Sequence, residues 1–517
     1  MALLTSACSG ATEDTSTTKG SGGTLTVGMT LTDLPNLDTS YAFSVGGESM
    51  RWAGLSLYEG LTAFDLTSTD KIPGVIGGLA ESWTASADAT SYTFKLRSGV
   101  KFTDGTPWNA DAAVFNIDRY VNKSAPQYSA GAAGVAGLFL GGVGSVKKVD
   151  EMTIEIDTPN HQPRAFLLQD LALLPMGSPT AIKAEGAGFS DKPVGTGPFM
   201  FESRVKGQSI TLKRNPDYWK GAAKLDKLVL RFIPDQTART AALRSGEVNF
   251  IETTAPDDIP DLKAQGFTVS QNAYSNVWRG VFDTTKAPWN DVRVRQAANL
   301  AVDREALATK VMSGTATAAY QVASAADPGF DAAIGEQYKY NPDKAKQLLA
   351  EAGYANGVKA TMSYPSSGSG SMDGNSIAQY IQSDLAKVGI TLDLVPMEFA
   401  TLSAEQNSGK MPGGASVAAW SGTFVLPSLW AVVTSTSKLN VGKYSNPKAD
   451  DLFTQAQAQA DQAKQTELFR QLNMQVTTDA AWLPVLTDEN PRAMSASVHD
   501  FVNPKSWFLD LRTTWVS

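Results

Sequence analysis

Tyr92-Thr-Phe-Lys-Leu-Arg97, followed after one serine by Gly99-Val-Lys-Phe-Thr-Asp-Gly-Thr-Pro107, is the stretch of sequence that decides the fold. Tyr92, Phe94 and Leu96 alternate with polar residues, and this period of two predicts a half-buried strand with a polar outer face. The Asp-Gly-Thr-Pro end of the stretch is rich in turn-forming residues and predicts the end of that strand.

Strand and helix patterns alternate along much of the remaining chain. Asn or Asp before an apolar run predicts a helix start, proline suits the first helical turn, and glycine suits the position after the helix. The expected elements are a strand at 24–28, a helix from Asn109 or Asp111, a helix after Asn290-Asp291, a helix from Asn341-Pro342 to Gly353, a strand at 360–364, a helix through Ile377, Ile381 and Leu385, and a strand at 389–394. This order predicts an α/β protein whose sheets are partly parallel.

The composition describes an ordinary globular body of several domains. A chain of 517 residues exceeds what one hydrophobic core normally serves, so two or three domains are expected. No apolar run approaches the roughly 20 residues of a membrane-spanning helix. The net charge of −8 and the absence of a Lys/Arg cluster disfavour nucleic acid as a partner.

Cys8 is the only cysteine of the chain, so it has no partner for a disulfide. The preceding Leu3-Leu-Thr-Ser-Ala7 resembles the lipobox of bacterial lipoproteins, although Thr5 stands where leucine is usual. Residues 9–23 are rich in Ser, Thr and Gly and predict a flexible tether. We therefore expect residues 1–23 to comprise a truncated export signal, a lipidation site at Cys8 and a tether; a chance cysteine near a terminus is the alternative.

The chain offers little for metal binding or catalysis. His161 and His499 are its two histidines, and neither has a Cys or His neighbour at the spacing of metal ligands. A Gly-x-Ser-x-Gly element with Asp and His following in order is also missing, which disfavours a secreted serine hydrolase. We expect no catalytic residue, no metal and no cofactor.

Several further motifs occur in one order along nearly the whole chain from Thr24. They resemble the family 5 extracellular solute-binding proteins, the dipeptide and oligopeptide receptors of ABC importers. Besides 92–97 and 99–107, the segments that carry the resemblance are Leu79-Ala-Glu-Ser-Trp83, Val194-Gly-Thr-Gly-Pro-Phe199, Arg214-Asn-Pro-Asp-Tyr-Trp219, Ala242-Leu-Arg-Ser-Gly-Glu-Val248, Asn290-Asp-Val-Arg-Val-Arg-Gln-Ala297, Asp303-Arg304, Ala350-Glu-Ala-Gly-Tyr354 and Tyr444-Ser-Asn-Pro447. Most of these residues suit packing: Gly195 and Gly197 permit a tight backbone path, and Trp83, Tyr218 and Trp219 are large core fillers.

The resemblance implies a two-lobed α/β fold of the type II periplasmic-binding-protein kind, with hinge strands between the lobes. Lobe I is discontinuous and carries an inserted subdomain. The implied division is a lobe I core at 24–57, 189–272 and 489–517, an inserted subdomain at 58–188, and lobe II at 273–488. It also implies a monomeric, exported protein that captures a solute between its lobes and delivers it to membrane permease subunits, either lipid-anchored on the outer face of the cytoplasmic membrane or in the periplasm.

The resemblance also assigns candidate ligand-binding residues. They come from a loop after the first strand, from a loop after the 360–364 strand, from a segment opening with Trp420, and from the hinge. The assigned residues are Tyr41, Phe43, Tyr128, Trp278, Ser366, Ser367, Phe399, Trp420, Ser421, Thr423, Phe424, Thr487 and Asp488.

Thr423 departs from the pattern of the peptide receptors. These receptors usually carry an aspartate three residues after the tryptophan that corresponds to Trp420, and this carboxylate pairs with the ligand's α-ammonium. Because a buried ammonium needs a counter-charge, either Asp488 or another carboxylate replaces it, or the ligand lacks a free amino terminus. The aromatic residues Trp420, Phe424 and Trp430 would also suit a neutral oligosaccharide; lobe II core is the other interpretation of Phe424 and Trp430.

Two further alternatives stay open at this stage. The loop Ser366-Ser-Gly-Ser-Gly-Ser371 lacks the Gly-Lys-Ser/Thr ending of a nucleotide-binding loop. The N-terminal amides of the helix after it are suited to hold an anionic or carboxylate group of a ligand, and a flexible surface loop is the equal alternative. A binding protein that signals to a membrane sensor would have the same sequence features as one that serves import.

Overall fold

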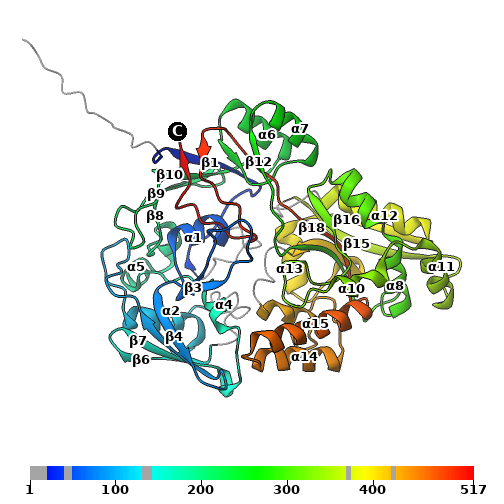
Figure 1. Cartoon of the computed structure of the whole chain (residues 1–517), viewed down its shortest axis with the longest axis horizontal. Helices are drawn as coiled ribbons and strands as arrows, with labels where there is room; N and C mark the ends of the chain where they lie inside the picture. The colour runs from blue at the N-terminus through cyan, green and yellow to red at the C-terminus, as the bar shows by residue number, and fades with distance from the viewer. Residues whose placement is uncertain (1–19, 40–48, 131–142, 368–373, 421–426) are drawn as a thin grey trace, which may run out of the picture.

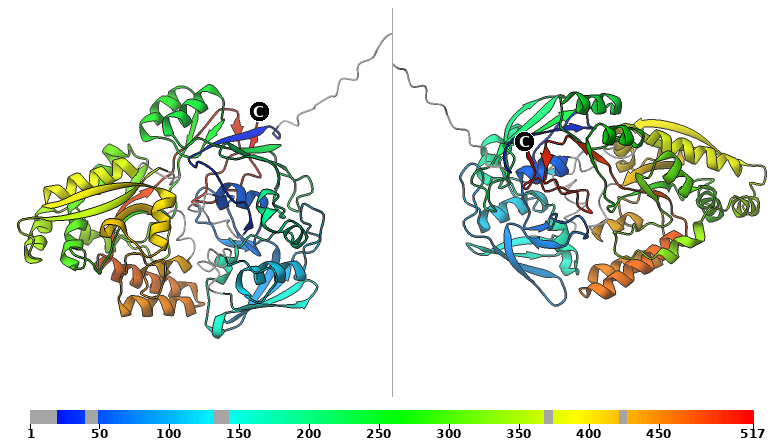
Figure 2. Two further views of the ribbon diagram at one scale, coloured as in Figure 1. Left: turned by 180° about the vertical axis from the view of Figure 1, so that it is seen from behind. Right: turned by 45° about the horizontal axis from the view of Figure 1, so that its top comes forward.

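A computed structural model of the chain describes residues 20–39, 49–130, 143–367, 374–420 and 427–517. Two lobes lie side by side, as Figure 1 shows: the first is coloured mostly blue to green and also carries the red C-terminal segment, and the second runs from green to orange. Figure 2 shows the same separation from behind and with the top of the molecule tilted forward. The predicted two-lobed α/β fold is confirmed.

A seven-stranded mixed sheet forms the centre of the first lobe, in the order β12-β19-β11-β1-β10-β9-β8. β1 runs parallel to both β10 and β11, whereas the other pairs are antiparallel. The strands are β1 (Thr24–Met29), β8 (Phe199–Val205), β9 (Ser209–Arg214), β10 (Lys227–Phe232), β11 (Phe250–Ile251), β12 (Thr268–Ser270) and β19 (Arg492–Met494). The sheet is thus assembled from three separate parts of the sequence.

The alternating 92–97 segment belongs to a separate antiparallel sheet in the same lobe, ordered β4-β5-β7-β6. Its strands are β4 (Ala80–Ala85), β5 (Ser91–Leu96), β6 (Ser145–Asp150) and β7 (Thr153–Asp157), and the short pairs β2 (Thr62–Phe64) with β3 (Val75–Gly77) and β20 (Val498–His499) with β21 (Trp515–Val516) complete the lobe. Tyr92, Phe94 and Leu96 are buried as the alternation predicts. The 79–107 motif is therefore a packing unit of this small sheet.

A six-stranded sheet forms the centre of the second lobe, in the order β14-β18-β13-β17-β15-β16. β15 is parallel to β16 and β17, and β13 is antiparallel to both of its neighbours. The strands are β13 (Val277–Phe282), β14 (Ala316–Ala318), β15 (Val358–Ser367), β16 (Ile390–Glu398), β17 (Ala415–Trp420) and β18 (Trp482–Asp488). Both large sheets are partly parallel, as the sequence predicts.

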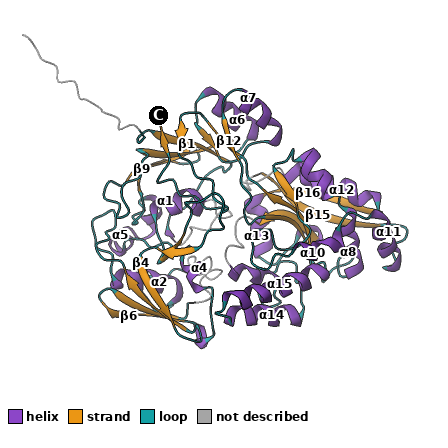
Figure 3. Cartoon of the chain, in the orientation of Figure 1, coloured by secondary structure: helices purple, strands orange, loops and turns teal. Residues whose placement is uncertain are grey.

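Helices surround these sheets, as Figure 3 shows by colour. They are α1 (Leu55–Leu57), α2 (Ala110–Val121), α4 (Leu167–Leu171), α5 (Pro179–Glu185), α6 (Gln236–Ser245), α7 (Ile259–Ala264), α8 (Val292–Ala301), α9 (Arg304–Ala306), α10 (Ala332–Gly335), α11 (Pro342–Glu351), α12 (Gly374–Lys387), α13 (Phe399–Asn407), α14 (Pro447–Ala458) and α15 (Gln462–Thr478). No helix in the described part of the chain combines the length and the hydropathy that a membrane crossing requires.

The predicted helix starts are correct in detail. The side chains of Asn109, Asp291 and Asn341 each accept a hydrogen bond from the first turn of α2, α8 and α11. Each cap satisfies a backbone N–H that the helix itself leaves unpaired. The apolar stripe of α8 packs into the core of the second lobe together with Ile377 and Leu385 of α12.

Candidate functional site

The two lobes are joined by two chain crossings. Residues 271–276 lead from β12 to β13, and residues 489–491 return from β18 to β19. The crossings run together: the Asn272 N–H donates to the Glu489 carbonyl at 3.0 Å, and the Asp488 N–H donates to the Asn276 carbonyl at 3.4 Å. Hinges between rigid bodies usually consist of a few loop or element-terminal residues, as these crossings do.

One edge of the six-stranded sheet lies directly beside this hinge. Val277 of β13 pairs with Trp420 of β17 on one side and with Thr487 of β18 on the other. β15, β16, β17 and β18 all run toward this edge, so Ser367 ends its strand there too. Ligands of open α/β sheets bind outside the carboxyl ends of the strands. This edge is therefore the candidate functional site.

Several residues assigned from the sequence lie at this edge. Trp420 and Ser367 are the last residues of β17 and β15, Thr487 is buried in β18, and half-buried Phe399 begins α13. The hydroxyl of Ser366 is exposed and donates to the Met397 carbonyl at 3.2 Å. The strand topology thus brings together residues that lie far apart in the sequence.

Other assigned residues lie elsewhere. Tyr128 is half-buried in the loop after α2, in the opposite lobe. Trp278 is fully buried in the core of the second lobe, and Trp430 is buried in a second apolar cluster of that lobe. Outside the described residues lie Cys8, Tyr41, Phe43, Ser421, Thr423 and Phe424.

Asp488 is held inside the hinge. Its side chain is fully buried and accepts hydrogen bonds from the Tyr274 hydroxyl at 3.2 Å and from the Asn490 N–H at 2.5 Å. Burial raises the pKa of this carboxyl to about 6, while the nearby guanidinium groups of Arg492 and Arg51 oppose the rise. Its oxygens accept hydrogen bonds from hinge groups. Asp488 is therefore poorly placed to replace the aspartate that peptide receptors carry at the position of Thr423.

A cluster of buried charged residues surrounds Asp488 on the side of the first lobe. The Arg51 guanidinium lies 4.0 Å from the centre of the Trp507 ring and 3.9 Å from the Glu252 carboxylate. Glu252 also accepts a hydrogen bond from the Trp52 indole at 2.8 Å. Buried charges persist in proteins when they are paired and hydrogen-bonded, as these are. Sequence reasoning missed this cluster because its members share no motif.

Asp327 is a further buried carboxylate, and it anchors the outgoing crossing to the second lobe. Asp327 accepts hydrogen bonds from the Ser275 hydroxyl and from the N–H and hydroxyl of Ser324, the latter two at 2.7 Å. Burial raises the pKa of Asp327 to about 6, although these hydrogen bonds favour its ionised form. Ser275 belongs to the crossing, so this contact fixes the hinge at one end.

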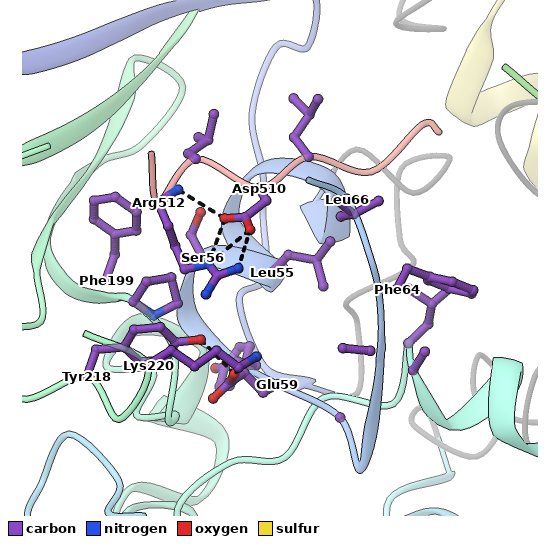
Figure 4. A pocket seen from close by; sticks show the side chains of 18 of the residues that line it. Leu55, Ser56, Glu59, Phe64, Leu66, Phe199, Tyr218, Lys220, Asp510 and Arg512 are labelled. Carbon is purple, nitrogen blue, oxygen red and sulfur yellow. Dashed lines mark hydrogen bonds and ion pairs between the residues drawn. The ribbon is translucent and has the colours of Figure 1, made fainter. Parts of the chain in front are cut away.

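A cavity of about 90 Å³ lies in the first lobe. Figure 4 shows Glu59, Tyr218 and Lys220 in its wall, opposite the ion pair of Asp510 and Arg512. The Glu59 carboxylate accepts hydrogen bonds from four side chains, at 2.7 to 3.2 Å: Thr196, Tyr218, Trp219 and Lys220. Burial, with the Glu59 charge, raises the pKa of the Tyr218 phenol.

This arrangement shows that two of the sequence motifs serve to pack the first lobe together. The 194–199 and 214–219 segments meet at Glu59, and the Arg97 guanidinium lies 4.4 Å from the centre of the Trp219 ring. A Cβ on Gly195 would lie 2.1 Å from the Leu57 carbonyl oxygen, so only glycine fits there. Glu59 itself went unpredicted, because nothing in its own neighbourhood marks it.

Comparisons with known proteins agree with this architecture. The family model for bacterial extracellular solute-binding proteins, family 5, matches residues 74–440. Heme-binding protein A of Haemophilus influenzae is 32% identical over 494 residues, which cover 90% of this chain and 88% of that protein. Di/tripeptide-binding protein 1 of Pseudomonas aeruginosa is 30% identical, with 87% of this chain and 86% of that protein covered.

A solved structure shares the fold over nearly the full length. The periplasmic binding protein DppA of Helicobacter pylori, an ABC transporter-associated protein in complex with the peptide STSA, superimposes with a TM-score of 0.83 at 25% identity. The alignment covers 96% of this chain and 98% of that one. The shared order of motifs, the two-lobed fold and the extent of these matches lead to one conclusion: this chain belongs to the bacterial extracellular solute-binding proteins of family 5.

Proposed function

We propose that this protein is the solute-binding component of an ABC importer and that it captures a peptide or peptide-like solute between its lobes. The observation that carries the proposal is the convergence of four strand ends on the sheet edge beside the two chain crossings of the hinge. The names of the similar proteins, for di- and tripeptides in one case and for a bound tetrapeptide in another, support the ligand class.

The proposed site uses both lobes. The second lobe contributes residues at and beyond the strand ends. The first lobe contributes aromatic residues that the family resemblance assigns to the opposite side of the cleft. We assign Ser366, Ser367, Phe399, Trp420, Ser421, Thr423, Phe424 and Thr487 to the first set, and Tyr41, Phe43 and Tyr128 to the second. Trp278 and Asp488 are left out of the proposed site, because one fills the core and the other is held in the hinge.

The lobe division implied by the family also becomes a proposal for this chain. The strands of the seven-stranded sheet fall within 24–57, 189–272 and 489–517, the four-stranded sheet falls within 58–188, and the six-stranded sheet falls within 273–488. Each proposed unit therefore contains whole sheets, which supports the division. Rotation about 271–276 and 489–491 would then open and close the lobes as rigid bodies.

Ligand binding would act through this rotation. A solute that contacts both lobes binds the closed state better than the open one and shifts the population toward it. A micromolar ligand contributes roughly 8 kcal/mol, which exceeds a hinge equilibrium of a few kcal/mol. The permease subunits would recognise the closed form, with the protein acting as a monomer and without any catalytic step.

Calorimetric titration of the purified protein tests the proposal. The panel comprises free di- to tetrapeptides, the same peptides with acetylated amino termini, glutathione, heme and neutral oligosaccharides. We expect at least one peptide or peptide-like member to bind with a dissociation constant near or below the micromolar range. Binding of oligosaccharides alone would overturn the proposed ligand class, and hydrolysis of a bound peptide would overturn the non-enzymatic assignment.

Lipid attachment at Cys8 is a separate proposal, carried by the sequence of residues 3–8 and the tether after it. Two acyl chains would hold the protein stably at a membrane, whereas one chain would hold it only marginally. Expression of the protein behind a complete export signal in a Gram-positive host, with and without Cys8→Ser, tests the proposal. We expect the substitution to move the protein from the membrane fraction to the medium; an unchanged distribution would contradict it.

A further inference from the structure

The lobes touch at a second place, apart from the hinge. Phe166, which precedes α4 in the first lobe, is 2% exposed and belongs to an apolar cluster made otherwise of residues from the second lobe. Its ring centre lies 6.3 Å from that of Phe453 in α14 and 5.7 Å from that of Phe469 in α15. Phe166 is therefore buried by the partner lobe rather than by its own.

The segment that carries Phe166 is fixed firmly to the first lobe. The Arg164 N–H donates to the Ala89 carbonyl at 2.9 Å, and the Tyr92 hydroxyl donates to the Arg164 carbonyl at 2.8 Å. The next N–H, that of Ala165, crosses to the second lobe and donates to the Gln457 carbonyl at 2.9 Å. The two hydrogen bonds of Arg164 within the first lobe and the one of Ala165 to the second lobe thus hold Phe166 beside Phe453 and Phe469.

The second lobe makes the reciprocal contact. Leu439, in the segment before α14, packs against a cluster of the first lobe and the hinge that contains Met50, Leu173, Tyr274 and Trp507. The same leucine also packs against the cluster that holds Phe166. Each lobe therefore places one apolar side chain against the apolar cluster of the other, and Leu439 links the two contacts.

We propose that Phe166 and Leu439 form a reciprocal clasp that sets the balance between open and closed lobes, so that these two residues determine solute affinity from outside the ligand site. Opening about the hinge must withdraw Phe166 from between Phe453 and Phe469 and expose it to water, which is unfavourable for a large apolar side chain. The clasp therefore raises the closed population before any solute arrives. Its effect on affinity rests on the proposed function, but its effect on closure does not.

The apparent affinity follows from the closed population. A ligand that binds only the closed form has an apparent dissociation constant equal to the intrinsic one divided by the closed fraction. Weakening the clasp lowers that fraction, so it weakens binding without changing any ligand contact. The solute would then also leave faster, because the clasp no longer holds the lobes together around it.

Disulfide trapping measures closure without a ligand. Ala165 and Gln457 share a backbone hydrogen bond of 2.9 Å, which brings their backbones close enough for a disulfide between cysteines at the two positions. Ala165→Cys with Gln457→Cys, in a Cys8→Ser background, leaves no other thiol in the chain. We expect the bridge to form in the ligand-free protein and to form at least about tenfold more slowly when Phe166→Ala or Leu439→Ala is added.

The controls separate closure from folding. Phe189→Ala removes an equally buried phenylalanine that packs beside Tyr58 within the first lobe, and it should leave the trapping rate unchanged. Leu439 is only half-buried, so Leu439→Ala keeps the test available if Phe166→Ala does not fold. Trapping rates that are the same with and without the clasp residues would overturn the proposal.

Ligand titration completes the test. For whichever solute binds the unmodified protein, we expect Phe166→Ala to raise the apparent dissociation constant about tenfold, mainly through faster dissociation, while Phe189→Ala leaves it unchanged. An unchanged constant together with slower trapping would refute the link between clasp and affinity. If no solute in the panel binds, the proposed function fails while the trapping result still decides whether the clasp controls closure.

Discussion

Asp38 and Arg119 form a buried bidentate ion pair, with Nη1 and Nη2 of the arginine 2.6 and 2.7 Å from the two carboxylate oxygens. The same Nη1 donates to the Thr39 hydroxyl at 2.9 Å. Arg119 lies on α2 of the inserted subdomain (58–188), whereas Asp38 lies next to the end of the described segment that follows β1. The pair therefore fixes the entry to a proposed ligand-binding loop against a rigid helix.

Replacing Arg119 by methionine should destabilise the protein strongly. The substitution leaves the Asp38 carboxylate buried without its counter-charge, and breaking such a pair costs about 3–5 kcal/mol. Urea unfolding followed by circular dichroism measures the loss. Lys148→Met is the control, because its ion pair with Asp111 is largely exposed and should contribute less than about 1 kcal/mol. Equal losses of stability from the two substitutions would show that burial does not make the Asp38–Arg119 pair more costly to break than the exposed pair.

Glu59→Gln should destabilise the protein, because it weakens the contact between the inserted subdomain (58–188) and the seven-stranded sheet region of the first lobe. The carboxylate accepts hydrogen bonds from four side chains, and an amide in its place turns one acceptor into a donor facing donors. We expect a loss of about 2–4 kcal/mol from these buried groups. Glu202→Gln, at an exposed pair with Lys227, is the matched control and should stay within about 1 kcal/mol.

Asp327 predicts a particular pH dependence of stability. Its pKa is raised from 3.8 to about 6 in the folded protein, so the folded state keeps a proton that the unfolded chain releases over that interval. The stability contributed by this group is fully present below pH 4 and is lost as the pH rises through 6, by about 3 kcal/mol at most.

Thermal unfolding of Asp327→Asn across pH 4 to 7 checks this sign. The variant carries no proton to lose, so its melting temperature should fall less between pH 4 and 6 than that of the unmodified protein. Asp88→Asn should keep the original profile over this interval, because Asp88 is exposed and hydrogen bonds from Ser86 and Thr90 hold its pKa below the usual value. A steeper fall in the Asp327 variant would contradict the predicted direction.

Gly195→Ala should destabilise the protein strongly, whereas Gly74→Ala should leave its stability almost unchanged. A Cβ at this position meets the Leu57 carbonyl oxygen at 2.1 Å and the Tyr58 ring at 2.5 Å, so the backbone must shift. We expect a loss of more than about 3 kcal/mol or no soluble protein. Gly74→Ala, where a Cβ meets nothing within 4 Å, should change the stability by less than about 0.5 kcal/mol.

Thr423→Asp should change ligand preference rather than stability. An aspartate there restores the counter-charge that the related peptide receptors use for the ligand's α-ammonium. We expect the affinity for a free peptide to rise at least about tenfold relative to the same peptide with an acetylated amino terminus. Thr423→Asn, which adds similar bulk without charge, should leave that ratio unchanged. A matching shift in both variants would show that size rather than charge is responsible.

Local elements were predictable because their signals lie within a few residues. Asn109, Asp291 and Asn341 cap helices through atoms two or three residues away, and the alternation of Tyr92, Phe94 and Leu96 is contained in one strand. The family motifs then supplied the lobe topology, which no local pattern contains. Both levels agree with the structure.

Long-range groups could not be predicted from local signals. The four donors that converge on Glu59 lie 137 or more positions away in sequence, and Phe166 has its aromatic partners in the other lobe. Trp278 shows a different limit. β13 is buried along its whole length on both faces, so its sequence shows no alternation that would separate a core residue from one that faces a ligand.

β19 has a consequence for how the chain is made. Ala493 pairs with both Val269 and Ile251, so this short strand closes a gap inside the sheet rather than extending its edge. A ribosome or an export channel delivers Arg492–Met494 only after all of residues 273–488 have emerged. The lobe that is synthesised first is therefore the last to be completed, and a chain that stops early leaves β12 without its neighbour.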